Sequence, residues 1–175
     1  MRRIVLTFGL ISGAALSAMM AISMAFHDQI GFGNAGLIIG YTTMVLAFLL
    51  VFFGIKAYRD NVGGGAVKFG KAFQVGLLIM LVSSACYVAT WQVIYYKFMP
   101  DFMDKYAAHE IEKARKAGAS EAQVAAQAKQ TADFQQMYKK PLVNIAFTFL
   151  EPLPPGLLIV ALSAGVLRRK AAAVT

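Results

Sequence analysis

The chain has little of what a soluble enzyme uses to fold and to react. Charged residues make up 15% of its 175 residues, against about a quarter in soluble domains. Cys86 is the only cysteine, which excludes an intrachain disulfide. The two histidines form neither an HxxxH nor an HExxH pattern, and no Ser-His-Asp or Cys-His arrangement can be argued. The sequence therefore predicts no enzyme, no metal centre and no cofactor.

Apolar residues, 58% of the chain, instead gather in four long runs. Each run comes near or exceeds the ~20 helical residues that cross a hydrocarbon core of roughly 30 Å. In lipid, only helices and closed barrels pair every backbone polar group. We therefore expect an all-α, integral membrane four-helix bundle that forms a single membrane domain over residues 1–175. The expected transmembrane helices cover residues 4–26, 37–55, 72–96 and 142–167.

The basic residues between these runs predict how the chain is threaded. If four helices alternate across a membrane, the segments on one side hold nine basic residues and a single acid, Asp60. Short segments rich in lysine and arginine stay in the cytoplasm, so both termini are predicted there, with residues 97–140 on the outer side. These charges serve topology, which argues against a nucleic-acid partner. The nine residues are Arg2, Arg3, Lys56, Arg59, Lys68, Lys71, Arg168, Arg169 and Lys170.

The first run has two possible fates. Its basic start and its end in Ser23-Met24-Ala25 resemble a cleaved secretory signal. Its length of about 23 residues exceeds the 7 to 15 residues of a signal core. This length favours a retained transmembrane helix.

The first run also carries small residues at four-residue spacing, including Gly9, Gly13 and Ser17. In membranes, such a stripe allows another helix to approach closely. The approaching helix can come from the same chain or from a second copy. We favour packing within the chain and keep a homo-oligomer as the alternative.

The two ends of the third run carry residues typical of membrane boundaries. Residues 65–71 match part of a phosphate loop, but position 72 is alanine and no strand precedes it, so Lys68 and Lys71 are interpreted as membrane anchors. Trp91, Tyr95 and Tyr96 close the other end. Such rings prefer the headgroup level, so we expect an aromatic belt at the outer interface.

Residues 100–139 form the one sizeable segment outside the predicted membrane helices. Pro100 suits the start of a first helix, and Gly118 suits its C-terminal cap. Ser120 and Gln123 fit a capping box that begins a second helix. The apolar faces are thin, so we expect an antiparallel helical hairpin that leans on the bundle or on a partner.

Glu151 is the only acidic or basic residue within the four predicted membrane helices, and three prolines follow it within four residues, beginning at Pro152. A carboxylate at a broken helix is typical of proton- or cation-coupled sites. Counted back from Arg168, however, Glu151 lies about 26 Å along the helix. This depth places it near the outer edge of the core, within reach of Lys97, Tyr95 or water. We interpret it as an interfacial carboxylate at a kink, with a transport site as the alternative.

The histidines supply the weak candidates for a metal site. His27 and Asp28 lie in the first outer loop, whereas His109 and Glu110 lie in the hairpin. A shared site would require the two segments to meet. Without metal-ligand spacing in either pair, we interpret them as surface residues.

Six segments together resemble, in order and spacing, a bacterial integral-membrane family catalogued as domain of unknown function 4199. The resemblance implies four transmembrane helices in the bacterial cytoplasmic (inner) membrane, with a helical insert before the last. It implies no activity, substrate or cofactor. It makes Tyr58, Arg59, Asp60, Glu151 and Pro152 the first candidates for a functional role. The segments are FGIKAYRD (53–60), FGKAF (69–73), YYKFMPDF (95–102), GAS (118–120), YKKPL (138–142) and EP (151–152).

These patterns lead to the hypothesis of a function that involves no catalysis. We expect a non-enzymatic membrane or envelope protein that acts through self-association or through a partner in the envelope, because its one extramembrane piece is a helical surface and its bundle is rich in small-residue contacts. The alternative is a small proton- or cation-coupled transporter or channel that uses Glu151 at the proline-broken fourth helix. The lipid bilayer itself is the remaining expected partner.

The charge distribution makes a testable prediction about topology. Reporters fused after residue 120 are expected to be active only when the reporter works outside the cytoplasm, because the segments rich in arginine and lysine hold the other side in the cytoplasm. Paired fusions of alkaline phosphatase and a fluorescent protein measure this directly. Cytoplasmic reporter activity at residue 120 would contradict the predicted orientation.

Overall fold

The computed structural model describes residues 1–169, with the side chain of Asp28 excepted, so Lys170 of the basic tail lies outside the described residues. The described chain is helical apart from turns, loops and one isolated β-bridge, which confirms the all-α prediction. The helices are α1 (Arg2–Ala25), α2 (His27–Ile30), α3 (Asn34–Asn61), α4 (Phe69–Val93), α5 (Phe102–Lys116), α6 (Glu121–Tyr138), α7 (Pro141–Leu150) and α8 (Leu153–Leu167), and a π-helical segment, Ile94–Phe98, continues α4.

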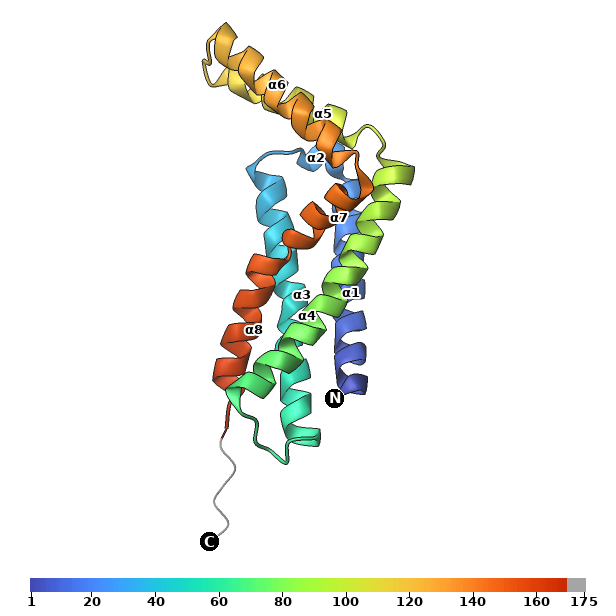
Figure 1. The fold of residues 1–175 in the computed structure, drawn as a ribbon, viewed down its shortest axis with the longest axis vertical. Helices are drawn as coiled ribbons and strands as arrows, with labels where there is room; N and C mark the ends of the chain where they lie inside the picture. Colours follow the sequence, from blue (N-terminus) through green and yellow to red (C-terminus); the bar gives the residue numbers. More distant parts are fainter. Residues whose placement is uncertain (170–175) are drawn as a thin grey trace.

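Four long helical stretches form the rods of the bundle (Figure 1). Helices α3 and α4 contact each other at its centre, and α1 and α8 both pack against this pair. Four helical stretches are long and apolar enough to cross a membrane: Arg2–Ala25, Asn34–Asn61, Phe69–Phe98 and Pro141–Leu167. The predicted four-helix membrane bundle is therefore confirmed.

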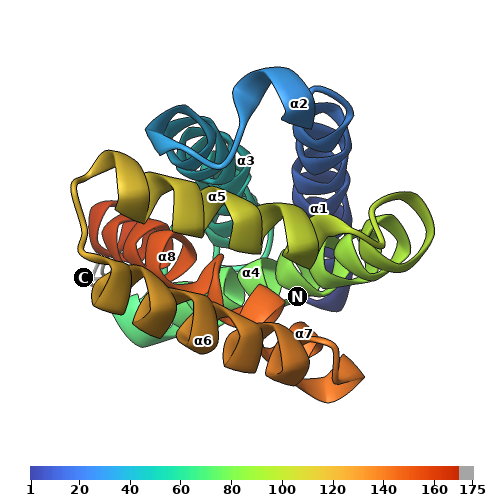
Figure 2. The ribbon, with the colours of Figure 1, turned by 90° about the horizontal axis from the view of Figure 1, so that it is seen from above.

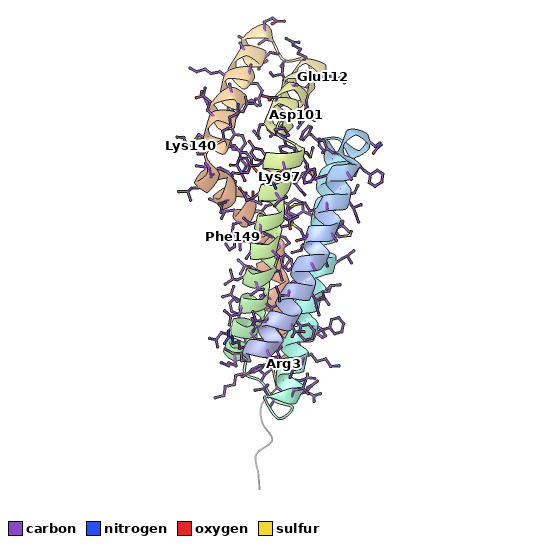
Figure 3. All side chains as sticks on the ribbon, turned by 90° about the vertical axis from the view of Figure 1, so that its right-hand side faces the viewer. Arg3, Lys97, Asp101, Glu112, Lys140 and Phe149 are labelled. Carbon is purple, nitrogen blue, oxygen red and sulfur yellow. The ribbon has the colours of Figure 1, made fainter. Side chains whose placement is uncertain are left out.

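The outside of the bundle is as apolar as its core. Phe48 and Met80 are fully buried between the helices, whereas Leu10, Ile38 and Leu158 are more than half exposed on the outer faces. Water would penalise such surfaces, but lipid does not. Charged side chains lie toward the two ends instead, as Arg3 at one end and Lys97 and Asp101 at the other illustrate (Figure 3).

The stripe of small residues on α1 lies against α4. A Cβ atom at Gly9 would lie 2.7 Å from Val82 Cβ, and one at Gly13 would lie 2.7 Å from Cys86 Cβ. Farther along the stripe, the Thr90 hydroxyl donates a hydrogen bond to Ser17 Oγ at 2.7 Å. Cys86 is half-buried in this contact. The stripe therefore packs within the chain.

Helix α3 is longer than the sequence predicted. It continues through Asn61, so Tyr58, Arg59 and Asp60 form its last turn and not the following loop. The chain turns after Asn61 through Gly63, where a Cβ would lie 2.2 Å from the Ala66 carbonyl oxygen, and through Gly64 and Gly65, which have positive φ. The expectation of a helix ending at residue 55 was wrong because lysine and arginine are good helix formers that hydropathy alone does not favour.

The loop after α3 is tied to the end of α8. Val67 and Arg169 form an isolated antiparallel bridge, with N–H···O distances of 3.1 and 2.9 Å in the two directions. Backbone pairing at Val67 and the start of α4 at Phe69 leave residues 65–71 without a phosphate-loop fold. This bridge joins the two segments at the same end of the bundle.

The insert forms the expected helical hairpin, α5 and α6, which pack against each other above the bundle (Figures 1 and 2). Gly118 adopts the left-handed conformation at φ 79° between them. The capping box is confirmed, because Ser120 Oγ accepts from Gln123 N–H and the Gln123 side chain accepts from Ser120 N–H. Gln135 of α6 also donates a hydrogen bond to Asp104 of α5.

The expected aromatic belt is mostly a docking surface for this hairpin. Trp91 is 6% exposed, and its indole N–H donates a hydrogen bond to the Tyr138 hydroxyl at 2.9 Å. Tyr95 is buried against the Tyr138 ring, with ring centroids 5.5 Å apart. Only Tyr96 remains exposed as a belt residue would be. The belt prediction was wrong for the other two rings because the hairpin covers them.

The α1–α4 contact makes a testable prediction about stability. Gly13→Leu should destabilise the bundle by about 1–3 kcal/mol, because overpacking a close contact forces backbone and side chains apart. Thermal unfolding in mild detergent measures the loss. Gly165→Leu on α8 is the matched control, since a Cβ there meets open space. Equal stability of the two variants would contradict the α1–α4 packing.

Candidate functional site

A cavity of about 360 Å³ lies at the hairpin end of the bundle. Residues from α1, α2, α3, α4, α5 and α6 line it together with Glu151, so no single segment builds the site. Its walls are mostly apolar and aromatic. The lining residues are Leu16, Met20, Ser23, Met24, His27, Ile30, Gly31, Phe32, Gly36, Leu37, Ile39, Gly40, Thr43, Met44, Tyr87, Phe102, Met103, Tyr106, Phe134, Tyr138 and Glu151.

The cavity exists because small side chains face it where α1 and α3 approach their outer ends. Ser23 lines it from α1, and Gly36, Gly40 and Thr43 line it from α3. A Cβ atom at Gly40 would meet open space. From above, α2 bridges α1 and α3 while α5 crosses the same end of the bundle (Figure 2). The short connection and the hairpin thus partly cover the space that the small residues leave.

Glu151 stands at the break in the fourth span. Helix α7 ends at Leu150 and α8 begins at Leu153, so the expected interruption of this span is present. The side chain accepts a hydrogen bond at Oε2 from the Tyr87 hydroxyl, at 2.9 Å. Sequence reasoning expected Lys97, Tyr95 or water in this place and missed Tyr87. The carboxylate points to α4 because the kink turns it toward the bundle rather than along the membrane surface.

The prolines around this break keep the fourth span in close contact with α4. Pro152 is fully buried, and Pro154 falls in the first turn of α8, where a missing N–H costs no intrahelical bond. The Gly156 N–H donates to the Pro152 carbonyl at 3.0 Å and starts the new helical ladder. A Cβ atom at Gly156 would lie 2.6 Å from Met80 Sδ. After the break, α8 therefore packs tightly against α4 at Gly156 and Met80.

The cavity wall contains an acidic side chain but, among the described residues, no lysine or arginine. Glu151 is the one carboxylate among the described residues that line it. None of the ion pairs within residues 1–169 includes Glu151. Burial raises the pKa of Tyr106 and of Tyr138, so both phenols stay neutral at ordinary pH. The site therefore combines one carboxyl group and the His27 imidazole with neutral hydroxyls and apolar walls.

The two histidine segments meet at the roof of the cavity. The Phe32 ring lies 4.3 Å from the His27 ring and 5.6 Å from the His109 ring, between centroids. Glu110 instead faces Lys113 at 3.6 Å, and the side chain of Asp28 lies outside the described part of the chain. Among the described residues, no three histidine, cysteine or acidic side chains are grouped as a metal would require. Aromatic packing accounts for both histidine contacts.

Tyr58, Arg59 and Asp60 lie at the opposite end of the bundle from the cavity (Figure 1). Arg59 Nε donates to Asp60 Oδ1 at 2.7 Å, and the Arg59 carbonyl accepts from Gly65 N–H. The two groups of candidates, at residues 58–60 and 151–152, are therefore not brought together. The first group supports the turn between α3 and α4.

The sequence reasoning missed the residues that complete the cavity. Tyr87 was one available signal, because a tyrosine within an apolar run needs a partner for its hydroxyl. Gln92 gave a similar signal for a polar contact outside the cavity lining, where its side-chain amide donates to Asn144 Oδ1 at 2.6 Å. Asn144 itself is fully buried in α7, and its Nδ2 has no partner among the described residues. The sequence carries no signal for the cavity itself, since residues far apart in the chain form it.

Comparison with known proteins gives a single identification. No curated protein and no solved structure matches the chain. The family described as "Protein of unknown function (DUF4199)" matches residues 7–169. The matched segment contains the hairpin, the cavity and the Glu151–Pro152 break. The chain therefore belongs to the DUF4199 family.

Proposed function

We propose that this protein is a non-enzymatic membrane protein that binds a small amphiphilic molecule in the cavity beneath its hairpin. The cavity itself carries the proposal. Its volume of about 360 Å³ lies within the 300–1,000 Å³ that is typical of ligand pockets. Its lining also has the usual composition of such pockets, with apolar walls and a few convergent polar groups, here Glu151, Tyr87 and Tyr138.

The lining residues of α3 support entry from the surrounding lipid. Leu37 and Ile39 both line the cavity and are exposed on the bundle surface. An apolar chain could enter beside this part of α3 without leaving hydrocarbon. We propose that the protein sits in the bacterial inner membrane with both termini in the cytoplasm. In this orientation, the cavity lies toward the outer leaflet.

Self-association or an envelope partner remains part of the proposal, but the small-residue stripe is not its surface. Gly9 and Gly13 are occupied by α4. A second copy or a partner would instead contact the exposed side of the hairpin or the lipid-facing sides of the rods. Exposed ion pairs such as Lys116 with Glu112, at 2.7 Å, keep the hairpin surface polar.

Coupled transport is the second candidate, and the helix break beside the cavity favours it. A carboxylate at a discontinuous helix is the usual location of a coupling site. Against it, the bundle below the cavity is filled: Phe48 and Met80 are fully buried, and Gly156 approaches Met80 closely. A pathway through four helices would require this core to separate. Binding without transport needs no such rearrangement.

Filling the cavity provides the test of ligand binding. Gly40→Phe should abolish the binding of single-chain amphiphiles, because the new ring projects into the open space at Gly40. Trp91 is the only tryptophan, and it contacts two cavity residues, Phe102 and Tyr138. Quenching of its fluorescence by brominated alkyl chains with alcohol, carboxylate or trimethylammonium headgroups therefore reports occupancy.

Gly165→Phe is the matched control for this measurement. Gly165 is also a helical glycine with open space at its Cβ, but it does not line the cavity. Saturable quenching by at least one of the three amphiphiles is expected in wild type and in Gly165→Phe. If all three quench Gly40→Phe as they quench wild type, the binding proposal fails.

Flux measurements separate binding from transport. Liposomes that contain the protein and a pH-sensitive dye should lose a proton gradient no faster than protein-free liposomes, because the packed core below the cavity blocks passage. Glu151→Gln should leave this rate unchanged. A proton or cation flux that is present in wild type and lost in Glu151→Gln would establish the transport alternative instead.

A further inference from the structure

We infer that the cavity selects lipophilic cations, that is, molecules in which an ammonium group is carried by an apolar body and lies against Glu151. This inference rests on the proposed binding function and adds the chemical class of the ligand. It depends on three features of the site: its charge, its aromatic walls and the incomplete bonding of its carboxylate.

The charge of the lining argues for a cationic guest. Glu151 is the sole carboxylate of the cavity wall, and no lysine or arginine of the described chain shares that wall. The residue is exposed at the wall rather than sealed into the core. In a site with low dielectric, an opposite charge at this position gains far more than it would in water. An anionic guest would meet repulsion from Glu151 with no lysine or arginine in the described wall to offset it, and His27 is the one basic side chain there.

The aromatic walls argue for the same class. Several aromatic rings line the same cavity as Glu151, and such rings attract cations through their quadrupoles. Quaternary ammonium groups are recognised in this way because they have no N–H to donate and are weakly hydrated. The phenol hydroxyls add oxygen atoms that carry partial negative charge. The rings are Phe32, Tyr87, Phe102, Tyr106, Phe134 and Tyr138.

The bonding of Glu151 leaves capacity for a ligand. Within residues 1–169, its hydrogen-bond partner is Tyr87, which reaches Oε2. A carboxylate has about four lone-pair positions, so the single bond from Tyr87 orients the group without saturating it. Tyr87 is 8% exposed and cannot turn away easily. It thus serves as a positioning residue that holds the carboxylate toward the cavity.

The remaining walls fit an apolar body. Leu16, Met20 and Met44 line the cavity from α1 and α3 and are buried. Methionine side chains adapt to guests of different shape. An alkyl chain or a hydrophobic ring system would lie against these residues while its nitrogen stays near Glu151. Such a cation could be the ammonium headgroup of a membrane lipid or a soluble amphiphilic amine, since both present the same chemistry.

The direct test compares two probes of equal chain length in maltoside detergent, which contributes no ammonium group. A brominated alkyltrimethylammonium should quench Trp91 at concentrations at least tenfold lower than the corresponding brominated alcohol. Glu151→Gln should weaken quenching by the cation about tenfold or more, as expected when a desolvated cation loses its charge partner. The same substitution should leave quenching by the alcohol nearly unchanged.

Two further variants keep the test decisive. Glu121→Gln removes a carboxylate from exposed α6, outside the cavity, and should bind the cation as wild type does. If Glu151→Gln fails to fold, Phe134→Leu takes its place, because it removes one ring from the wall while keeping an apolar side chain. It should weaken cation binding severalfold and alcohol binding hardly at all.

The possible outcomes distinguish this inference from the proposed function. Equal quenching by alcohol and cation, or stronger quenching by the carboxylate probe, would overturn the selectivity for cations while leaving ligand binding intact. Absence of saturable quenching by any probe would overturn both. Displacement of the cationic probe by phosphatidylethanolamine, but not by phosphatidylglycerol, would support the inference and assign a lipid headgroup. Displacement by alkylamine alone would support it and assign a soluble amine.

Discussion

The need to pair every backbone polar group in lipid shapes the whole molecule. Three of the four spans meet it with uninterrupted helices, the third ending in a π-helical segment. The fourth span breaks at Glu151 and Pro152, and there the chain needs both a polar partner and tight packing. The backbone is paired on both sides, by Glu151 N–H to the Phe147 carbonyl and Gly156 N–H to the Pro152 carbonyl. Tyr87 donates to the Glu151 side chain, and the close approach of Gly156 to Met80 supplies the tight packing. The break is thus tolerated because Pro152 is buried and the chain on both sides of it stays in contact with α4.

Small residues act in two opposite ways along the same bundle. Where Gly9 and Gly13 face α4, their missing side chains bring two helices into contact, which is the main source of helix association where lipid offers no hydrophobic drive. Where Gly40 faces the outer end, nothing moves in to fill the space. The difference lies in the connections, because α2 joins α1 and α3 across that end while the hairpin covers it (Figure 2). The same small residues therefore give tight helix packing along the bundle and a cavity at its hairpin end.

Much of the fold could be predicted from the sequence because its signals are local. Run length gave the four spans, and the Ser120 capping box and Gly118 gave the hairpin. The prolines after Glu151 gave the helix break. What could not be predicted depends on tertiary contact: the partner of Glu151, the burial of Trp91 and the enclosed volume. A tryptophan near a membrane boundary has the same sequence signature whether lipid or a hairpin covers it.

The hairpin explains why the site sits at this end of the bundle. Two short helices with a thin apolar seam are not stable alone, and here they gain stability from aromatic contacts with the bundle. Trp91 contacts Phe102 of α5 with centroids 4.9 Å apart and bonds to Tyr138 of α6, so one side chain joins both helices to α4. Phe102 and Tyr138 also line the cavity. The residues that hold the hairpin in place are therefore among those that form the roof of the cavity.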